Sequence, residues 1–161
     1  MDNLKLSQQV GDALIANNLT ISTAESCTGG LILSTLTDIS GSSAYVMGGM
    51  VTYSNDAKMQ HVRVQEQTLI QYGAVSEPVA REMAVGVRQV FDTDYALSVT
   101  GIAGPGGGTD EKPVGLTYIG LSGRDGIVAV QRHVWDGNRI TNKQSSVHAA
   151  LTLLLTMIGS S

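Results

Sequence analysis

Strand-like and helix-like segments alternate along the first hundred residues, and this alternation restricts the fold more than any other feature of the sequence. Apolar residues at helical spacing predict a helix over residues 4–17, and the run LTISTA (19–24) predicts a strand directly after it. Further strands are expected over 44–54 and 94–101. Strands that are separated by helical crossovers pair in parallel, so we expect a parallel sheet here. The intervening helices are predicted over 28–39, 55–61 and 65–72, and a longer helix should begin after the N-cap Ser76.

The C-terminal part of the sequence predicts a different kind of strand pairing. The segments 114–122 and 127–135 both alternate between apolar and polar residues, and the turn 123–126 (GRDG) joins them, which indicates an antiparallel hairpin. A last helix is expected from about Asn138. The whole chain, 1–161, therefore predicts one domain, a three-layer α/β/α sandwich with a mixed, mostly parallel sheet in which the hairpin adds one antiparallel strand.

Composition excludes several classes of function. With 161 residues and 42% apolar residues, the chain can bury a core of its own. A net charge of −4 and only 4% aromatic residues argue against a nucleic-acid partner. A single cysteine allows no intrachain disulfide and suits a reducing cytoplasm. The sequence also contains no apolar run long enough for a signal peptide or a membrane span, so we expect a cytoplasmic protein without a membrane partner.

The turn over residues 24–30 (AESCTGG) places two candidate nucleophiles, Ser26 and Cys27, between a strand and a helix. Ligands of α/β proteins usually bind at this edge of the sheet. Free backbone N–H groups at the helix start could hold an anion or form an oxyanion hole. A plain turn in which Ser26 or Thr28 caps the helix explains the same residues. Cys27 could have a lowered pKa near a helix start, or it could be a small buried side chain.

A serine nucleophile needs a base, and the sequence offers histidine or lysine. His61, His133 and His148 all lie away from the glycine-rich turns, and their spacing fits no metal site. In the segment TYSNDAK, Ser54 is the expected N-cap, which makes Tyr53 and Lys58 neighbours at the positions of a hydrophobic staple. A partly buried Lys58 would lose its proton more easily than a free lysine, whereas a solvated Lys58 would not.

A second glycine-rich stretch follows the strand 94–101. Thr100 and Gly101 should end this strand at the same edge of the sheet as Ser26. The loop 101–113 (GIAGPGGGTDEKP) contains too many glycines for a regular element, and its backbone could approach a ligand closely. In the strand 44–54, the pair Gly48–Gly49 also suggests a bulge or a close backbone approach.

Four sequence blocks together resemble one known family. AESCTGG, GSSAYVMGGMVTYSNDAK, GAVSEPVAREMA and VTGIAGPGGGTDEKPVG are similar to the C-terminal domain of the CinA (competence-damage-inducible protein) family, in the same order and spacing, and the similarity extends over residues 5–157. This resemblance implies an α/β/α sandwich and hydrolysis of the carboxamide of nicotinamide mononucleotide, with release of nicotinic acid mononucleotide and ammonia. It implies Ser26 as the nucleophile, Lys58 as the general base and Tyr53 as a partner in proton transfer, without a metal or a cofactor.

The expected binding site for the nucleotide combines the two glycine-rich turns with the start of the last helix. We also expect a homo-oligomer, namely a dimer. Family members usually carry GDR and a further arginine near the last helix, whereas this chain has Asn138, Arg139 and Lys143 there, so a catalytically silent module that binds pyridine nucleotides is the alternative. The predicted substrate-binding residues are Cys27, Thr28, Gly29, Gly30, Thr100, Gly101, Gly104 and Arg139.

Overall fold

The computed structural model describes residues 1–160, and in this part of the chain five strands form one sheet in the order β2–β1–β3–β4–β5. β1 pairs in parallel with both β2 and β3, while β4 is antiparallel to both β3 and β5. The mixed sheet, in which β4 is the reversed strand, is therefore confirmed. The strands are β1 (Ile21–Glu25), β2 (Val46–Val51), β3 (Tyr95–Gly101), β4 (Leu116–Gly123) and β5 (Val128–Val134).

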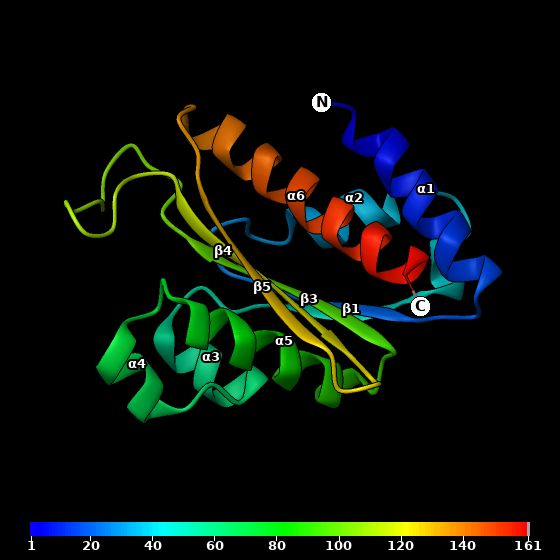
Figure 1. Ribbon diagram of the computed structural model, residues 1–161, viewed down its shortest axis with the longest axis horizontal. Coiled ribbons are helices and arrows are strands. Elements are labelled where there is room, and N and C mark those ends of the chain that lie inside the picture. Colours follow the sequence, from blue (N-terminus) through cyan, green and yellow to red (C-terminus); the bar gives the residue numbers. More distant parts are fainter. Residues whose placement is uncertain (161) are drawn as a thin grey trace.

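Helices cover both faces of this sheet and make the three predicted layers (Figure 1). α1, α2 and α6 pack on one face, and α3, α4 and α5 lie on the other. A short 3₁₀ helix, η1 (Ser42–Ala44), precedes β2. The helices are α1 (Asn3–Ala16), α2 (Leu31–Thr37), α3 (Asn55–Val62), α4 (Glu66–Tyr72), α5 (Glu77–Phe91) and α6 (Arg139–Gly159).

Predicted helix starts agree with the structure where a side chain caps the helix locally. Ser54 Oγ accepts from the Ala57 amide (3.0 Å) at the start of α3, and Asn138 Oδ1 accepts from the Thr141 amide (2.9 Å) at the start of α6. Ser76 likewise accepts a backbone N–H at the start of α5. These bonds satisfy amides that have no partner inside the helix.

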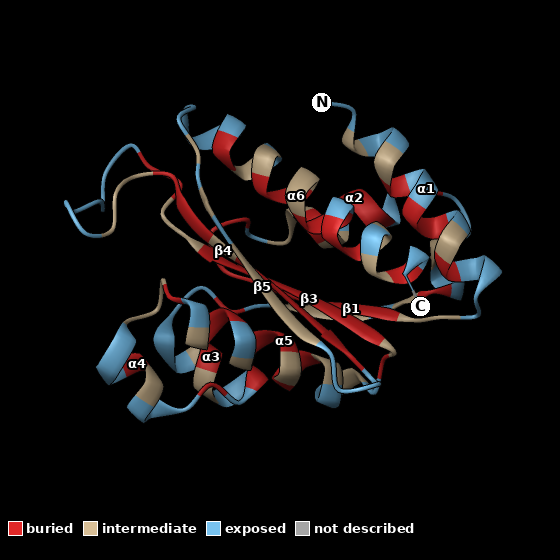
Figure 2. Ribbon diagram, in the orientation of Figure 1, coloured by how far each residue is buried: buried red, intermediate tan, exposed pale blue. Residues whose placement is uncertain are grey.

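The core lies on both sides of the sheet (Figure 2). All five residues of β1 are buried, as expected of a strand that is flanked by other strands and covered by helices on both faces. The glycine pair of β2 shows both predicted features. The register against β1 shifts between Val46 and Gly48, and a Cβ atom on Gly48 or Gly49 would collide with Phe91 or Thr23. Among residues 1–160, no helix has the length and hydropathy of a membrane span.

Candidate active site

The parallel strands β2, β1 and β3 end side by side, and they bring the candidate site residues to one edge of the sheet. Beyond the end of β1, the Ser26 amide donates to the Val99 carbonyl (3.0 Å), and the Thr52 amide donates to the Glu25 carbonyl (2.8 Å). The pairing with the neighbouring strand therefore continues for one residue past the end of β1 and of β2. Thr100 follows Val99 in the same way that Ser26 follows Glu25, so Ser26 and Thr100 occupy neighbouring positions.

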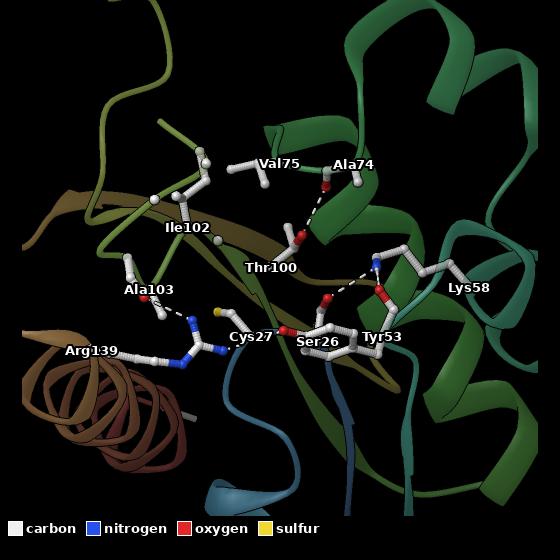
Figure 3. A pocket seen from close by; sticks show the side chains of 14 residues that line it. Ser26, Cys27, Tyr53, Lys58, Ala74, Val75, Thr100, Ile102, Ala103 and Arg139 are labelled. Atoms are coloured by element: carbon white, nitrogen blue, oxygen red, sulfur yellow. Dashed lines mark hydrogen bonds between the residues drawn. The ribbon is translucent and has the colours of Figure 1, made fainter. Parts of the chain in front are cut away.

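Lys58 lies in the first turn of α3, and its side chain extends to Ser26 (Figure 3). Its Nζ atom lies 3.0 Å from Ser26 Oγ, and only 1% of its surface is exposed. The carbonyl oxygens of Thr52 and Tyr53 accept from the same Nζ atom at 2.9 and 3.2 Å. The lysine is therefore buried, and the hydrogen bonds of its Nζ atom join it to two backbone carbonyls and to Ser26.

Burial lowers the pKa of Lys58, because the charged ammonium loses hydration there. A neutral amine has two N–H bonds and one lone pair. The carbonyls of Thr52 and Tyr53 can accept both N–H bonds, and the lone pair is then directed at the Ser26 hydroxyl. This arrangement can accept the proton of Ser26, which is what a serine nucleophile requires.

Glu25 lies on the opposite face of β1 and corrects one prediction about the turn. Its carboxylate is 1% exposed and accepts from the amides of Ile32 (3.0 Å) and Leu33 (2.9 Å) as well as from the Thr28 hydroxyl. The first amides of α2 were expected to be free for an anion, and this is wrong for these two. Neither Ser26 nor Thr28 caps the helix, because the carboxylate has that function.

Cys27 is a buried thiol, and its pKa is raised to about 11. The main cause is burial, and the negative charge of Glu25 contributes. Of the two alternatives left open for Cys27, the structure shows the small buried side chain and not the thiol with a lowered pKa. At neutral pH the thiol keeps its proton, which makes it a poor nucleophile.

A cavity of about 280 Å³ opens above Ser26, between the ends of the strands, the loop after β3 and the start of α6. This volume is near the lower end for small-molecule sites, which span about 300–1,000 Å³. Of the predicted residues, Thr28, Gly29 and Gly30 do not line it. The predicted residues that do are Ser26, Cys27, Tyr53, Lys58, Thr100, Gly101, Gly104 and Arg139.

Tyr53 and Arg139 form the exposed side of this cavity. Arg139 Nη1 donates to the Gly104 carbonyl (2.8 Å), and Nη2 donates to the Tyr53 hydroxyl (3.3 Å). The side chains of Tyr53 and Lys58 were predicted to be neighbours. The contact that the structure shows is from Lys58 Nζ to the Tyr53 carbonyl, while the phenol of Tyr53, a residue that is 63% exposed, accepts from Arg139. The arginine thus connects three separate segments around the cavity.

The turn after Cys27 lies outside the cavity lining, and within it Thr28 is buried while Gly29 is exposed. Gly29 and Gly30 have φ angles of 63° and 97°, which favour glycine. Lys143 on α6 approaches this turn, since a Cβ atom on Gly29 would lie 3.9 Å from Lys143 Nζ. Within residues 1–160 this half-buried ammonium has no hydrogen bond or ion pair, so it is available to an anion.

Two residues with important contacts were missed from the sequence. Glu25 lies in the turn 24–30, before α2 begins, and an acidic residue before a helix start was the available signal. Asn142 is buried on α6, where it donates to the Ala103 carbonyl (3.0 Å) and accepts from the Gly137 amide (3.0 Å). It holds the glycine-rich loop to the helix, but its partner is 39 residues away and no local pattern marks it.

The histidines lie outside the cavity. His133 stacks on Trp135, with ring centroids 4.5 Å apart, and His148 Nδ1 lies 3.0 Å from Asn3 Oδ1. His61 is in the last turn of α3. No cluster of three His, Cys, Asp or Glu side chains that could hold a metal occurs among residues 1–160.

A serine hydroxyl that faces a buried lysine amine has the geometry that a nucleophile–base pair needs, and here it lies at the carboxyl edge of the parallel strands of an α/β/α sandwich. This combination defines a class of domain with a candidate hydrolytic site. The chain belongs to the family described as the CinA C-terminal domain, which matches residues 3–158.

Relatives of two lengths share this domain. The nicotinamide-nucleotide amidohydrolase PncC of Escherichia coli K12 is 48% identical over 151 residues, which cover 93% of this chain and 92% of that protein. A putative competence-damage inducible protein of Halothermothrix orenii is 50% identical over 153 residues, which cover 95% of this chain but only 37% of the longer protein.

Solved structures of the family have the same fold. The competence/damage inducible protein CihA from Agrobacterium tumefaciens superposes with a TM-score of 0.94 at 43% identity, covering 97% of this chain and 95% of that one. A CinA superfamily protein from Klebsiella pneumoniae superposes with a TM-score of 0.96 at 32% identity, with both chains covered completely.

Proposed function

We propose that this protein is a nicotinamide-nucleotide amidase, which hydrolyses the carboxamide of nicotinamide mononucleotide to the carboxylic acid and ammonia. The observation that carries the proposal is the contact of 3.0 Å between Ser26 Oγ and the buried Lys58 Nζ at the floor of a cavity. The PncC relative, which matches this chain over almost its full length, supports the substrate class.

In the proposed reaction, Ser26 Oγ attacks the carboxamide carbon while Lys58 takes the hydroxyl proton. The tetrahedral intermediate collapses, the C–N bond breaks, and Lys58 returns the proton to the leaving nitrogen, which departs as ammonia. Water then attacks the acyl-enzyme, with Lys58 again as the base; the bond between the acyl carbon and Ser26 Oγ breaks, Lys58 returns the proton to Oγ, and the acid is released. Tyr53 helps to orient the groups at the mouth of the cavity.

The negative charge on the intermediate needs hydrogen-bond donors. The amides of Ser26 and Gly29 donate to backbone carbonyls, whereas those of Cys27 and Thr28 have no backbone acceptor within residues 1–160. We propose that the amide of Cys27 contributes to the oxyanion hole, because Cys27 directly follows the nucleophile and lines the cavity, whereas Thr28 does not line it.

The phosphate of the nucleotide requires cations. Arg139 borders the cavity, and Lys143 lies near Gly29 without a partner in the described part of the chain. Together they supply two positive charges for a group that carries about two negative charges. Lys143 stands where family members have a second arginine, so the positive charge of that region is retained.

Release of ammonia from nicotinamide mononucleotide by the purified protein tests the proposal. We expect turnover by the wild-type chain and none above background by the folded Ser26→Ala variant. Binding of the nucleotide without ammonia release would contradict an amidase and favour a silent binding module. Dialysis against a strong chelator should leave the rate unchanged, because neither proposed step uses a metal.

We further propose that the protein acts in the cytoplasm as a homodimer. The single cysteine is buried and unpaired, which suits a reducing compartment. Light scattering after size-exclusion chromatography tests the assembly, and a monomer at micromolar concentration would contradict it.

A further inference from the structure

Thr100 is the neighbour of Ser26 across the sheet, and its side chain lies on the same face. The register pairs Glu25 with Val99, which makes Ser26 and Thr100 the next residues along the two parallel strands. Side chains alternate along a strand, so Thr100 points to the same side as Ser98, whose hydroxyl donates to α5. Thr100 lines the cavity together with Ser26.

The proton of the Thr100 hydroxyl is used in a hydrogen bond within the protein. Its Oγ1 donates to the Ala74 carbonyl at 2.8 Å, and Figure 3 shows this bond directed away from Ser26. A hydroxyl has one O–H donor and two acceptor lone pairs. With only 1% of the residue exposed, little water is available to replace the Ala74 carbonyl as the acceptor. Towards the cavity, Thr100 is therefore an acceptor without a proton to give.

We propose that Thr100 selects the carboxamide substrate over the carboxylate product, an inference that rests on the proposed function. The NH₂ group of a carboxamide on Ser26 donates an N–H to Thr100 Oγ1, which turns the carbonyl oxygen towards the amide of Cys27. The carboxylate product has two oxygens and no proton, so one oxygen faces the lone pairs of Thr100. The site thus binds the amide and repels the acid once ammonia has left.

This selection does not follow from the positively charged side chains around the cavity. Arg139 and Lys143 bind the phosphate, which the substrate and the product share. Lys58 Nζ donates to the carbonyls of Thr52 and Tyr53, and its role in the proposed reaction is to take the proton of Ser26. Discrimination between NH₂ and O⁻ needs an acceptor that cannot switch to being a donor, because a site built to accept an N–H bond rejects a ligand without it.

The test measures binding to the inactive Ser26→Ala protein by titration calorimetry. The ligands are nicotinamide mononucleotide, nicotinic acid mononucleotide and the 3-acetylpyridine analogue, in which CH₃ replaces NH₂. We expect the amide to bind about tenfold more tightly than the acetyl analogue, the effect of one hydrogen bond to a buried acceptor. We expect the acid to bind more weakly than the amide.

Adding Thr100→Val keeps the branched shape of the side chain and removes the hydroxyl. In this double variant the amide and the acetyl analogue should bind equally, and the preference over the acid should shrink by about tenfold. Thr100→Ser should keep the preference. The matched control is Ser98→Ala, which removes a similar hydroxyl bond to the Ala80 carbonyl (2.6 Å) outside the cavity and should leave the ratios unchanged.

Equal affinity of the amide and the acetyl analogue for Ser26→Ala overturns the inference, even if Thr100→Val does not fold. An amide preference that survives Thr100→Val, or that Ser98→Ala abolishes equally, overturns it as well. These failures differ from a failure of the proposed function, which would show as wild-type protein that releases no ammonia. Absence of binding by any of the three nucleotides would contradict both proposals.

Discussion

Two ionisable side chains are buried at the end of β1, Glu25 on the α2 face and Lys58 on the α3 face, and they differ in what surrounds the charge. Glu25 accepts from two helix amides and one hydroxyl, so its oxygens are occupied by the fold itself. Lys58 donates to two carbonyls and faces Ser26 at the floor of a cavity. Burial of a charge alone does not mark a catalytic residue; what matters is whether a reactive partner and an open space lie beside it.

The largest effect should come from removing the amine of Lys58. Lys58→Met should lower kcat for amide hydrolysis by several orders of magnitude, and Lys58→Arg should do the same because an arginine stays protonated. Stopped assays of ammonia release measure both. The double variant with Ser26→Ala should be little worse than either single variant, since the two residues act as one unit.

The unfolding free energy of Lys58→Met should equal or exceed that of the wild type. The apolar chain fills the same space and avoids the desolvation of a buried amine. Urea denaturation measures this quantity. A near-normal kcat for Lys58→Arg would contradict the proposal, because the residue would then act as a fixed positive charge.

Glu25→Ala should give the opposite pattern. It leaves two amides of α2 and the Thr28 hydroxyl without their acceptor, which should lower the free energy of unfolding by about 3 kcal/mol, or the melting temperature by roughly 10 °C. Glu25→Gln, which keeps one acceptor oxygen, should lose less. At a temperature where the variant is folded, kcat should fall far less than in Lys58→Met. If well-folded Glu25→Ala lost as much kcat as Lys58→Met, Glu25 would have a role in catalysis as well as in stability, which would contradict this prediction.

The lowered pKa of Lys58 predicts how both the rate and the stability depend on pH. The rate should rise as Lys58 loses its proton, with a midpoint below the value of about 10.4 for free lysine. Between the folded and unfolded pKa values, the unfolded chain binds a proton that the folded chain does not. Stability from this residue therefore increases with pH in that window. Lys58→Met should abolish that increase, whereas Glu25→Gln should retain it; an unchanged profile in Lys58→Met would contradict the assignment.

Arg139 differs from both buried residues, because it is an exposed cation whose hydrogen bonds to Gly104 and Tyr53 can be replaced by bonds to a phosphate. Arg139→Ala should raise KM by about tenfold and change kcat little, because a phosphate contact is common to the ground state and the transition state. Initial rates over a range of substrate concentrations separate the two constants. A fall in kcat at constant KM would place Arg139 in the chemistry, next to Tyr53.

Local parts of this structure could be predicted from the sequence because their causes are local. Ser54 and Asn138 cap helices through bonds to residues three positions away, and hydrophobic spacing is a property of neighbouring residues. The order of strands and helices followed from the same patterns. The predicted helix over 28–39 was too long, because the real cap, Glu25, lies seven residues before the first amide it binds and the turn between them is not helical.

The candidate site was less predictable because its contacts join distant segments. Ser26 and Lys58 are 32 residues apart, and Arg139 is 86 residues from Tyr53. Only the family resemblance selected these residues together from the sequence. The sequence offered both a lowered pKa and burial for Cys27, and only the structure decides between them, because burial depends on the packing of the whole domain rather than on the helix start that follows the residue.

Cys27 should give the smallest effect, and the reason separates it from Lys58. Both residues lie beside Ser26 and both lose hydration. The cysteine is charged when it has lost its proton, whereas the lysine is charged when it carries its proton. Burial disfavours the thiolate and raises the pKa of Cys27 to about 11, whereas it disfavours the ammonium and lowers the pKa of Lys58. The same environment therefore suppresses one nucleophile and prepares the base for the other.

Cys27→Ala should keep kcat within about threefold and cost about 1 kcal/mol of stability from the small cavity it leaves. Thiol-specific reagents should modify the wild-type protein slowly at pH 7. Loss of turnover in a folded Cys27→Ala protein, with Ser26→Ala still active, would reverse the assignment of the nucleophile.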